Sequence, residues 1–309
     1  MTAARDRSPS ASYVALGYAG VALAASSWGT WPLILRTAER TASISPALES
    51  TILMAVIFVG SGVFVLNDRV ARKATTLQWL GIAWLGVGDA LNDYFFFAAY
   101  QKTSVAVAVL SHYLAPLFVA LSAPFLLRER PTVRTYAAVA VAFFGLVLLL
   151  RPWSGAARPG DAVGALFGAT SAVFYASNVL VNKRLGSAFS ASELMFFHCF
   201  VALPVLAAMV PHAEWHAVNA RAASVVAVGS LGPGILGGMA FVWGLRRVPA
   251  SHAGALTLLE PLVAVMLGAA VYGEGVGLTG FWGAALILTG AVLVVLQRGR
   301  AEQAEVSVG

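Results

Sequence analysis

The sequence has very little charge for its length. Asp, Glu, Lys and Arg make up 11% of the 309 residues, whereas about 25% is usual for a soluble domain. Hydrophobic residues make up 59%, and the mean hydropathy is +0.79. Such a composition leaves too little charge to cover the surface of a soluble fold, so it excludes water-soluble enzymes, nucleic-acid-binding proteins and disordered proteins. It indicates a protein embedded in a membrane.

Motifs that carry chemistry are scarce as well. Cys199 is the single cysteine, which excludes an intramolecular disulfide and a cysteine-rich metal site. The patterns GxxxxGK[ST], HExxH and GxSxG are absent, so direct use of ATP is not expected. The five histidines form no convincing ligand cluster. We therefore expect no metal and no cofactor, and no cleavable signal peptide is expected either.

The sequence does contain a series of apolar stretches, each near the roughly 20 residues with which a helix crosses a bilayer. They are continuous and rich in Ala, Leu and Val, without the alternation of a membrane β-barrel. We therefore expect an all-α membrane protein with ten transmembrane helices and no soluble domain. The expected spans are Tyr13–Leu35, Ser50–Leu66, Leu77–Tyr100, Thr103–Leu127, Thr135–Leu150, Ala162–Val181, Leu194–Pro211, Ala222–Leu245, Val248–Gly273 and Gly275–Gln297.

The basic residues set the expected orientation. With the N-terminus in the cytoplasm, fourteen of the 20 Lys and Arg residues fall in cytoplasmic segments and six fall outside. This bias predicts a multi-pass protein of the bacterial inner membrane with cytoplasmic tails at residues 1–12 and 298–309. The net charge of +6 is then explained by short loops beside anionic lipid, and no nucleic-acid partner is expected.

The chain also contains an internal repeat. When the sequence is shifted by 145 positions, three pairs of identical residues coincide. They are Pro116 with Pro261, Glu129 with Glu274, and Gly145 with Gly290. We therefore expect two five-helix repeats, 13–150 and 162–297, joined by a linker at 151–161. Because five is odd, the second repeat would lie upside down relative to the first, which is typical of secondary transporters.

Two segments resemble a known family. "HYLAPLFVALSAPFLLRERP" and "LTLLEPLVAVMLGAAVYGEG" are similar to the paired fourth and ninth helices of EamA-type proteins of the drug/metabolite transporter superfamily, and "SSWGTW" in the first span also fits. The resemblance covers Tyr13 to Leu296. It implies ten helices in two inverted halves around a central cavity. The segment from Tyr113 to Pro116 is similar to that of amino-acid exporters, including the aromatic-amino-acid branch.

The third span carries acidic residues at its centre, at a cost of about 2.5–3.5 kcal/mol each on insertion scales. At about 100° per residue, one face of this helix collects Asp89, Asn92, Asp93, Phe96 and Tyr100. We expect this face to line a cavity and to bind a substrate amine or a proton. Hydrogen bonds between helices, or a protonated Asp89, are the alternatives.

Further candidates lie on other spans. Glu260 and His112 are expected, with Asp89, to take part in proton coupling, since Asp, Glu and His form proton relays in transporters. His112 and four aromatic residues are also candidates for substrate contact through cation–π or stacking interactions, with simple packing as the alternative: Trp28, Tyr113, Tyr175 and Trp243. Glu129 and Glu274 are expected to cap helices or anchor loops.

Proline and glycine mark the expected hinges. Pro116 and Pro261 each remove a backbone donor in mid-helix. Pro233 and Gly234 lie in a glycine-rich eighth span, which is expected either to gate the cavity or to allow close packing.

Acidic residues without a Lys or Arg well inside any span suit a substrate that carries an amine. We therefore predict a secondary transporter, not an enzyme, that exports small amine-bearing metabolites, amino acids favoured, by alternating access. A channel or passive facilitator, and less so a membrane-embedded lipid-modifying enzyme, are the alternatives. The expected partners are the lipid bilayer and a small-molecule substrate. The oligomeric state is left open, a monomer included.

Overall fold

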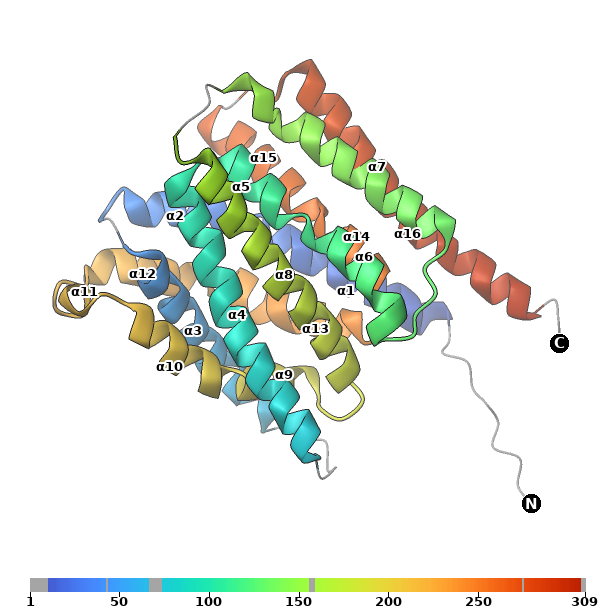
Figure 1. Cartoon of the computed structure of the whole chain (residues 1–309), viewed down its shortest axis with the longest axis horizontal. Coiled ribbons are helices and arrows are strands. Elements are labelled where there is room, and N and C mark those ends of the chain that lie inside the picture. Colours follow the sequence, from blue (N-terminus) through green and yellow to red (C-terminus); the bar gives the residue numbers. More distant parts are fainter. Residues whose placement is uncertain (1–10, 43, 67–73, 156–158, 274, 307–309) are drawn as a thin grey trace.

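The computed structural model describes residues 11–42, 44–66, 74–155, 159–273 and 275–306, with side chains described between residues 12 and 297. Every regular element in these ranges is a helix, and the long helices lie side by side in one bundle (Figure 1). The elements are α1 Ala11–Trp28, α2 Trp31–Glu39, α3 Pro46–Val65, α4 Thr76–Lys102, α5 Val105–His112, α6 Ala115–Leu126, α7 Val133–Leu150, η1 Pro152–Ser154, α8 Asp161–Leu185, α9 Ala191–Phe197, α10 Cys199–Met209, α11 His212–His216, α12 Ala220–Gly229, η2 Leu231–Gly237, α13 Gly238–Leu245, α14 Ala250–Thr257, α15 Leu259–Tyr272 and α16 Gly277–Val306.

Eight helical segments of the described chain are long and apolar enough to cross a membrane. The protein is therefore a multi-pass membrane protein. The eight segments are Pro46–Val65, Val105–Leu126, Val133–Ser154, Asp161–Leu185, Ala191–Met209, Ala220–Leu245, Ala250–Tyr272 and Gly277–Gln297. They fall on the second span and on the fourth to tenth spans expected from the sequence. The first and third spans correspond to α1 with α2 and to α4, which packs along α8.

Several expected spans are not single helices. Two of them break where Pro116 and Pro261, the expected hinge residues, interrupt the backbone hydrogen bonding. Proline at position i cannot donate to the carbonyl of residue i−4. Accordingly α5 ends at His112, four residues before Pro116, and α14 ends at Thr257, four residues before Pro261. The first span also divides, between α1 and α2, and the seventh divides at His198. These breaks place non-helical backbone near the middle of the bundle.

Two helix boundaries also differ from the expected ones. Helix α8 continues to Leu185, four residues beyond the expected end at Val181, and thereby carries Lys183 within its last turn. Helix α9 begins at Ala191 because the Ser190 side chain accepts from the backbone N–H of Glu193, and Glu193 in turn accepts from the N–H of Ser190. The apolar stretches missed both boundaries, since charged and capping residues do not count as apolar.

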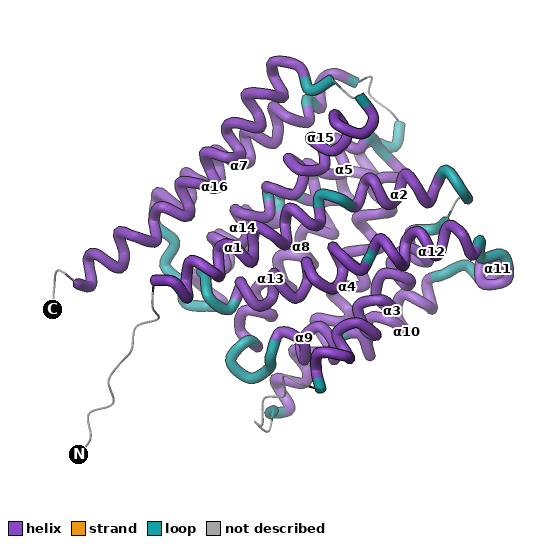
Figure 2. The backbone as a smooth tube through the Cα atoms, turned by 180° about the vertical axis from the view of Figure 1, so that it is seen from behind, coloured by secondary structure: helices purple, strands orange, loops and turns teal. Residues whose placement is uncertain are grey.

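Helices α7 and α16 form an antiparallel pair along one edge of the bundle (Figures 1 and 2). Glycine makes their close approach possible. A Cβ on Gly145 would lie 2.7 Å from the carbonyl oxygen of Gly283, and one on Gly290 would lie 2.6 Å from the Cβ of Ala142. Small residues at such an interface let helix backbones pack closely in a membrane. This pair contributes only Leu150 to the central cavity described below.

Candidate functional site

A cavity of about 510 Å³ lies between the helices of the bundle. This volume is in the range of small-molecule binding sites, about 300–1,000 Å³. At one end its lining includes the exposed side chains of Arg36, Glu39 and Gln101, so the cavity reaches the surface there. We call this end the Arg36 end. The cavity does not extend to the opposite end of the bundle, near Lys183, which is called the Lys183 end.

The acidic residues of α4 line the wall of the cavity. The Nδ2 atom of Asn178 on α8 donates to Oδ1 of Asp89 at 3.0 Å. The Nε2 atom of His198, at the junction of α9 and α10, lies 3.1 Å from Oδ2 of Asp89. One turn further along α4, Nδ2 of Asn92 donates to Oδ1 of Asp93 at 3.1 Å. Each carboxyl group thus has a polar neighbour and still faces the cavity.

Two glycines on α4 allow these neighbours to reach Asp89. A Cβ on Gly88 would overlap the side-chain amide of Asn178. A Cβ on Gly86 would lie 2.5 Å from the carbonyl oxygen of His198. A larger residue at 88 would turn the Asn178 amide away, and one at 86 would push the α9–α10 junction away from α4. The glycines that precede Asp89 in the sequence therefore position its hydrogen-bond partners.

Aromatic side chains form a second wall of the cavity, nearer the Arg36 end. The ring centroids of Phe96 and His112 lie 4.1 Å apart, and those of His112 and Tyr175 lie 5.4 Å apart. His112 is held by its Nδ1 atom, which lies 2.8 Å from Oγ of Ser171. Tyr100 packs edge-on against Phe96 at 4.9 Å. Rings arranged in this way can accept a cation on their faces or stack on an apolar group.

Glu260 lines the same cavity from the first turn of α15, directly before Pro261. Its place depends on Gly29, at the break between α1 and α2. A Cβ on Gly29 would lie 2.7 Å from the carbonyl oxygen of Glu260 and 2.6 Å from Cβ of Val263. The two helix breaks therefore meet directly and bring the carboxyl group of Glu260 to the cavity.

The wall opposite Asp89 contains an irregular helix. Segment η2 has the wide turns of a π-helix over Leu231–Gly237. Trp28 on α1 donates from Nε1 to the carbonyl oxygen of Pro233 at 2.9 Å, and its ring packs 5.0 Å from that of Phe241. A single indole N–H thus satisfies a carbonyl group in this irregular backbone. π-Helical turns are frequent at functional sites.

The Lys183 end is closed by polar contacts between helix termini. The Nζ atom of Lys183 donates to the carbonyl oxygens of Leu245 at 2.7 Å and Val248 at 2.6 Å, which lie at the turn between α13 and α14. The carboxylate of Glu129 accepts from the backbone N–H of Ala250 at 2.9 Å, so Glu129 anchors the same turn. These charged groups satisfy the free backbone groups at the end of α13 and the start of α14.

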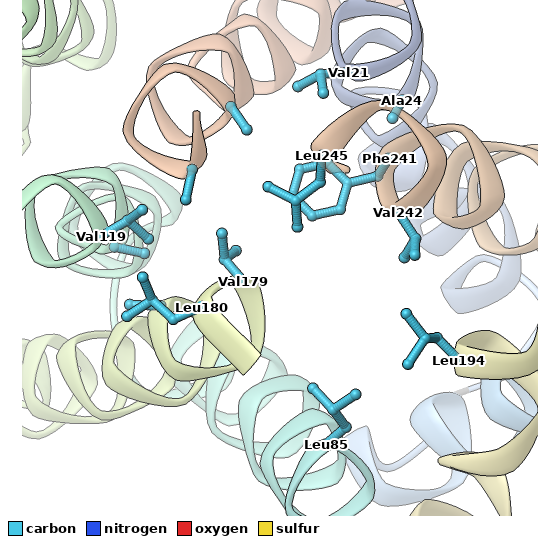
Figure 3. Close-up of a cluster of buried hydrophobic side chains, with 14 of the residues drawn as sticks. Val21, Ala24, Leu85, Val119, Val179, Leu180, Leu194, Phe241, Val242 and Leu245 are labelled. Atoms are coloured by element: carbon cyan, nitrogen blue, oxygen red, sulfur yellow. The ribbon is translucent and has the colours of Figure 1, made fainter. Parts of the chain in front are cut away.

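Apolar side chains fill the space between the cavity and this closed end. They come from helices far apart in the sequence and point toward one another (Figure 3). Val179, Asn182 and Val242 line the cavity, whereas Leu180 and Leu245 are buried outside its lining. At this end the cavity is therefore bounded by apolar side chains and by Asn182, next to Lys183 in the sequence.

The sequence profile described as the EamA-like transporter family matches the chain twice, over residues 15–151 and 162–296. The chain belongs to the EamA-like transporter family. The two matched segments begin 147 positions apart and end 145 positions apart. The protein is thus a membrane transporter of the drug/metabolite transporter superfamily and not an enzyme.

Relatives and a solved structure agree with this membership. The chain is 31% identical over 232 residues to an uncharacterized transporter of Archaeoglobus fulgidus, covering 74% of this chain and 79% of the relative. It is 23% identical over 254 residues to an uncharacterized transporter of Bacillus subtilis, covering 81% and 79%. A crystal structure with 22% sequence identity has the same fold, with a TM-score of 0.74 over 93% of this chain and 99% of the other.

In this EamA-like transporter, most of the residues expected to bind substrate surround one cavity. The lining includes nine of the ten expected residues, namely Trp28, Asp89, Asn92, Asp93, Phe96, Tyr100, His112, Tyr113 and Tyr175. The tenth, Trp243, lies elsewhere. Its ring lies 3.5 Å from the guanidinium carbon of Arg247, because the face of α13 that points to the cavity carries Phe241 and Val242 instead. The sequence identifies Trp243 as an aromatic residue within a span but does not show which face of α13 points to the cavity.

Three of the four expected hinge residues line the cavity, and one does not. Pro233, Gly234 and Pro261 line the cavity, whereas Pro116 packs against Gly254 of α14 outside the lining. Glu274, expected as an anchor like Glu129, lies outside the described residues.

The structure adds three polar residues that the sequence does not place near the cavity or its closed end. His198 and Asn178 lie beside Asp89, and Lys183 binds the turn between α13 and α14. The signal for His198 and Asn178 was the one that identified Asp89, a polar residue inside an apolar stretch. Their proximity to Asp89 depends on the packing of α8 and α10 on α4, which one sequence does not reveal.

Proposed function

We propose that the protein is a secondary transporter that exports small amine-bearing metabolites, amino acids favoured, across the bacterial inner membrane by alternating access. The observation that carries this proposal is one central cavity that reaches the surface at one end only. It is closed at the other end by apolar side chains and by the contacts of Lys183. Alternating access requires such an asymmetric state and its inverse.

The proposal includes ten transmembrane helices in two inverted five-helix repeats. A shift of 147 places Gly17 on Gly164, and a shift of 145 places Val248 on Thr103. Gly17 of α1 packs against Val248 at the turn between α13 and α14, and Gly164 of α8 packs against Thr103 at the turn between α4 and α5. The two contacts are thus equivalent under exchange of the repeats, as two related halves require.

The same equivalence suggests how the cavity closes at the Arg36 end. A shift of 147 places Arg36 on Lys183, which binds the carbonyl oxygens of Leu245 and Val248. The matching carbonyl groups in the first repeat belong to Tyr100 and Thr103. In the structure Arg36 instead lies over the ring of Tyr272, at 4.9 Å from its centroid. In the inverse state Arg36 would bind the carbonyls of Tyr100 and Thr103 and close this end.

The orientation follows from the distribution of basic residues. The Lys183 end carries most of the Lys and Arg residues of the short loops, and such loops face the cytoplasm. Both termini are then cytoplasmic. With this orientation the Arg36 end, where the cavity reaches the surface, would face outward. A substrate in the cavity would then leave to the outside, which is consistent with export.

The charges in the cavity favour a substrate with an amine. Asp89, Asp93 and Glu260 line it, whereas Arg36 at the mouth is the one Lys or Arg in the lining among the described residues. An ammonium group can pair with Asp93, and the aromatic wall can bind the remainder of the molecule. Tyr113 and Tyr175 line the same space, and a tyrosine hydroxyl group can donate to the carboxylate of an amino acid.

Counterflow in proteoliposomes tests this function. Vesicles preloaded with an unlabelled mixture of the twenty amino acids and several polyamines should take up the labelled mixture faster than empty vesicles. Asp93→Asn should abolish this uptake. Glu214→Gln should retain it, because Glu214 lies outside the cavity lining and a Gln side chain keeps the oxygen that accepts from Ser45. Uptake without saturation or stimulation by the preload would favour the channel or passive facilitator, and uptake of no amine would reject the substrate class.

A further inference from the structure

The contact between His198 and Asp89 fixes the number of protons that the two side chains share. The Nδ1 atom of His198 lies 2.8 Å from the carbonyl oxygen of Leu194, which can only accept, so Nδ1 carries a hydrogen. Nε2 lies 3.1 Å from Oδ2 of Asp89. Without a proton between them, these two atoms would present lone pairs to each other. The pair therefore holds one proton, on the ring or on the carboxyl group, and it is neutral as a whole.

The surroundings allow this proton to be lost and regained. Beside the pair lies a small space of about 20 Å³, lined in part by Asn178 and Asn182. A volume of about 10–15 Å³ holds one water molecule, provided that polar partners are present, and this space offers four polar side chains. His198 is buried, whereas 36% of the Asp89 side chain is exposed toward the cavity. A proton can thus reach the pair from the cavity side through Asp89.

Few other titratable groups face the pair. Asp93 follows one turn later on α4, Tyr175 lies on α8, and the thiol of Cys199 lies 3.9 Å from Nε2 of His198. The thiol donates to the carbonyl oxygen of Met195 at 3.1 Å, so it is engaged away from the pair. Asp93 is the one acidic neighbour among these described groups, and its carboxyl group lines the cavity one turn of α4 from Asp89.

We propose that the Asp89–His198 pair is the proton-binding site of this transporter and that the ammonium group of the substrate competes with that proton. This inference rests on the proposed function, which supplies the ammonium group. In the proton-loaded state the pair is neutral and attracts an ammonium group weakly. When the ammonium group lies between Asp93 and Asp89, the shared proton leaves to the cavity and His198 stays neutral. One proton therefore enters for each ammonium group that leaves.

The competition can be measured in proteoliposomes with the labelled mixture of amino acids and polyamines. An acid interior drives protons out and should stimulate uptake by the wild type and by His212→Gln, a matched control on the exposed helix α11. In His198→Gln the ratio of uptake with and without the gradient should fall to one, while counterflow at equal pH persists. Stimulation of His198→Gln equal to that of the wild type would overturn the proposal.

A second measurement needs no substrate. In protein labelled with ¹⁵N-histidine, the ring nitrogens of His198 should remain protonated to a higher pH in the wild type than in Asp89→Asn, with the His212 signal unchanged. An unchanged His198 titration in Asp89→Asn would overturn the shared proton even if both variants fail to transport. The His198 titration could differ between the wild type and Asp89→Asn while the wild type transports none of the mixture. That result would support the proton site and reject the proposed substrate class.

Discussion

The ammonium group of Lys183 lies 2.7 Å from the carbonyl oxygen of Leu245 and 2.6 Å from that of Val248, and so joins the end of α8 to the turn between α13 and α14. Helix α8 and the turn between α13 and α14 both belong to the second half of the chain. Asn182, next to Lys183 in the sequence, bounds the cavity at this end. A lysine side chain thus connects the closure of one end of the cavity to the position of α13.

Lys183→Met should weaken this closure, because it removes two hydrogen bonds from a charged donor, each worth about 1.5–3 kcal/mol. We expect a lower melting temperature in detergent. We also expect faster labelling of a cysteine introduced at Val179, in a Cys199→Ala background, from the cytoplasmic side. Arg184→Met is the matched control, since Arg184 is exposed on the same turn. Equal labelling in both variants would contradict a role of Lys183 in closure.

Gly88→Ala adds only one methyl group, yet it should impair transport strongly. The added Cβ would overlap Oδ1 of Asn178, so this flexible amide group would have to turn away and would cease to donate to Asp89. The loss of such a hydrogen bond costs about 0.5–1.5 kcal/mol. Gly232→Ala is the control, because nothing lies within 4 Å of a Cβ at that position. Thermal unfolding and counterflow should separate the two variants, and equal behaviour would argue against the packing explanation.

Phe96→Leu should reduce the affinity for substrate. The ring contacts His112 and Tyr100 in the cavity wall, and a cation–π contact with an ammonium group contributes about 0.5–2 kcal/mol. We therefore expect a higher half-saturation concentration in counterflow, with the maximal rate less affected. Phe281→Leu should behave as the wild type, since Phe281 on α16 is 61% exposed and lies outside the cavity lining. An unchanged half-saturation concentration in Phe96→Leu would remove this ring from the site.

Pro261→Ala should slow the exchange between states. Alanine restores a donor for the carbonyl of Thr257, where α14 now ends, and so favours one continuous helix. We expect the rate of counterflow to fall while substrate binding in detergent persists. Pro124→Ala provides the comparison, because Pro124 lies inside α6, away from the cavity. A Pro261→Ala protein with the wild-type rate would show that this break is not a hinge.

The sequence predicts the helical bundle well, because the cost of exposing polar groups to lipid leaves a strong pattern. The apolar stretches locate the membrane-crossing segments, and the prolines at 116 and 261 locate two breaks. The acidic face of α4 was also predictable, since intramembrane carboxyl groups are costly and need a polar neighbour. The eight apolar spans confirm the all-helical membrane protein, and Asp89 lies in the cavity lining.

The partners across helices could not be predicted in this way. His198 reaches Asp89 only because Gly86 lets α10 approach α4, and nothing in a single sequence pairs these residues. Trp243 was misplaced because an all-apolar helix gives no signal for its rotation. The end of α8 was set too early, since Lys183 interrupts the apolar stretch while its helix continues.

The proposed repeat has a consequence for how the two halves divide their work. A shift of 145 places Phe96 on Phe241, both of which line the cavity, but it places Asp89 on Gly234 and Asp93 on Gly238. One half thus supplies fixed charge, and the other supplies a flexible backbone at the equivalent sites. A chimera built from two copies of the first half would bring four carboxyl groups together and lose the π-helical wall.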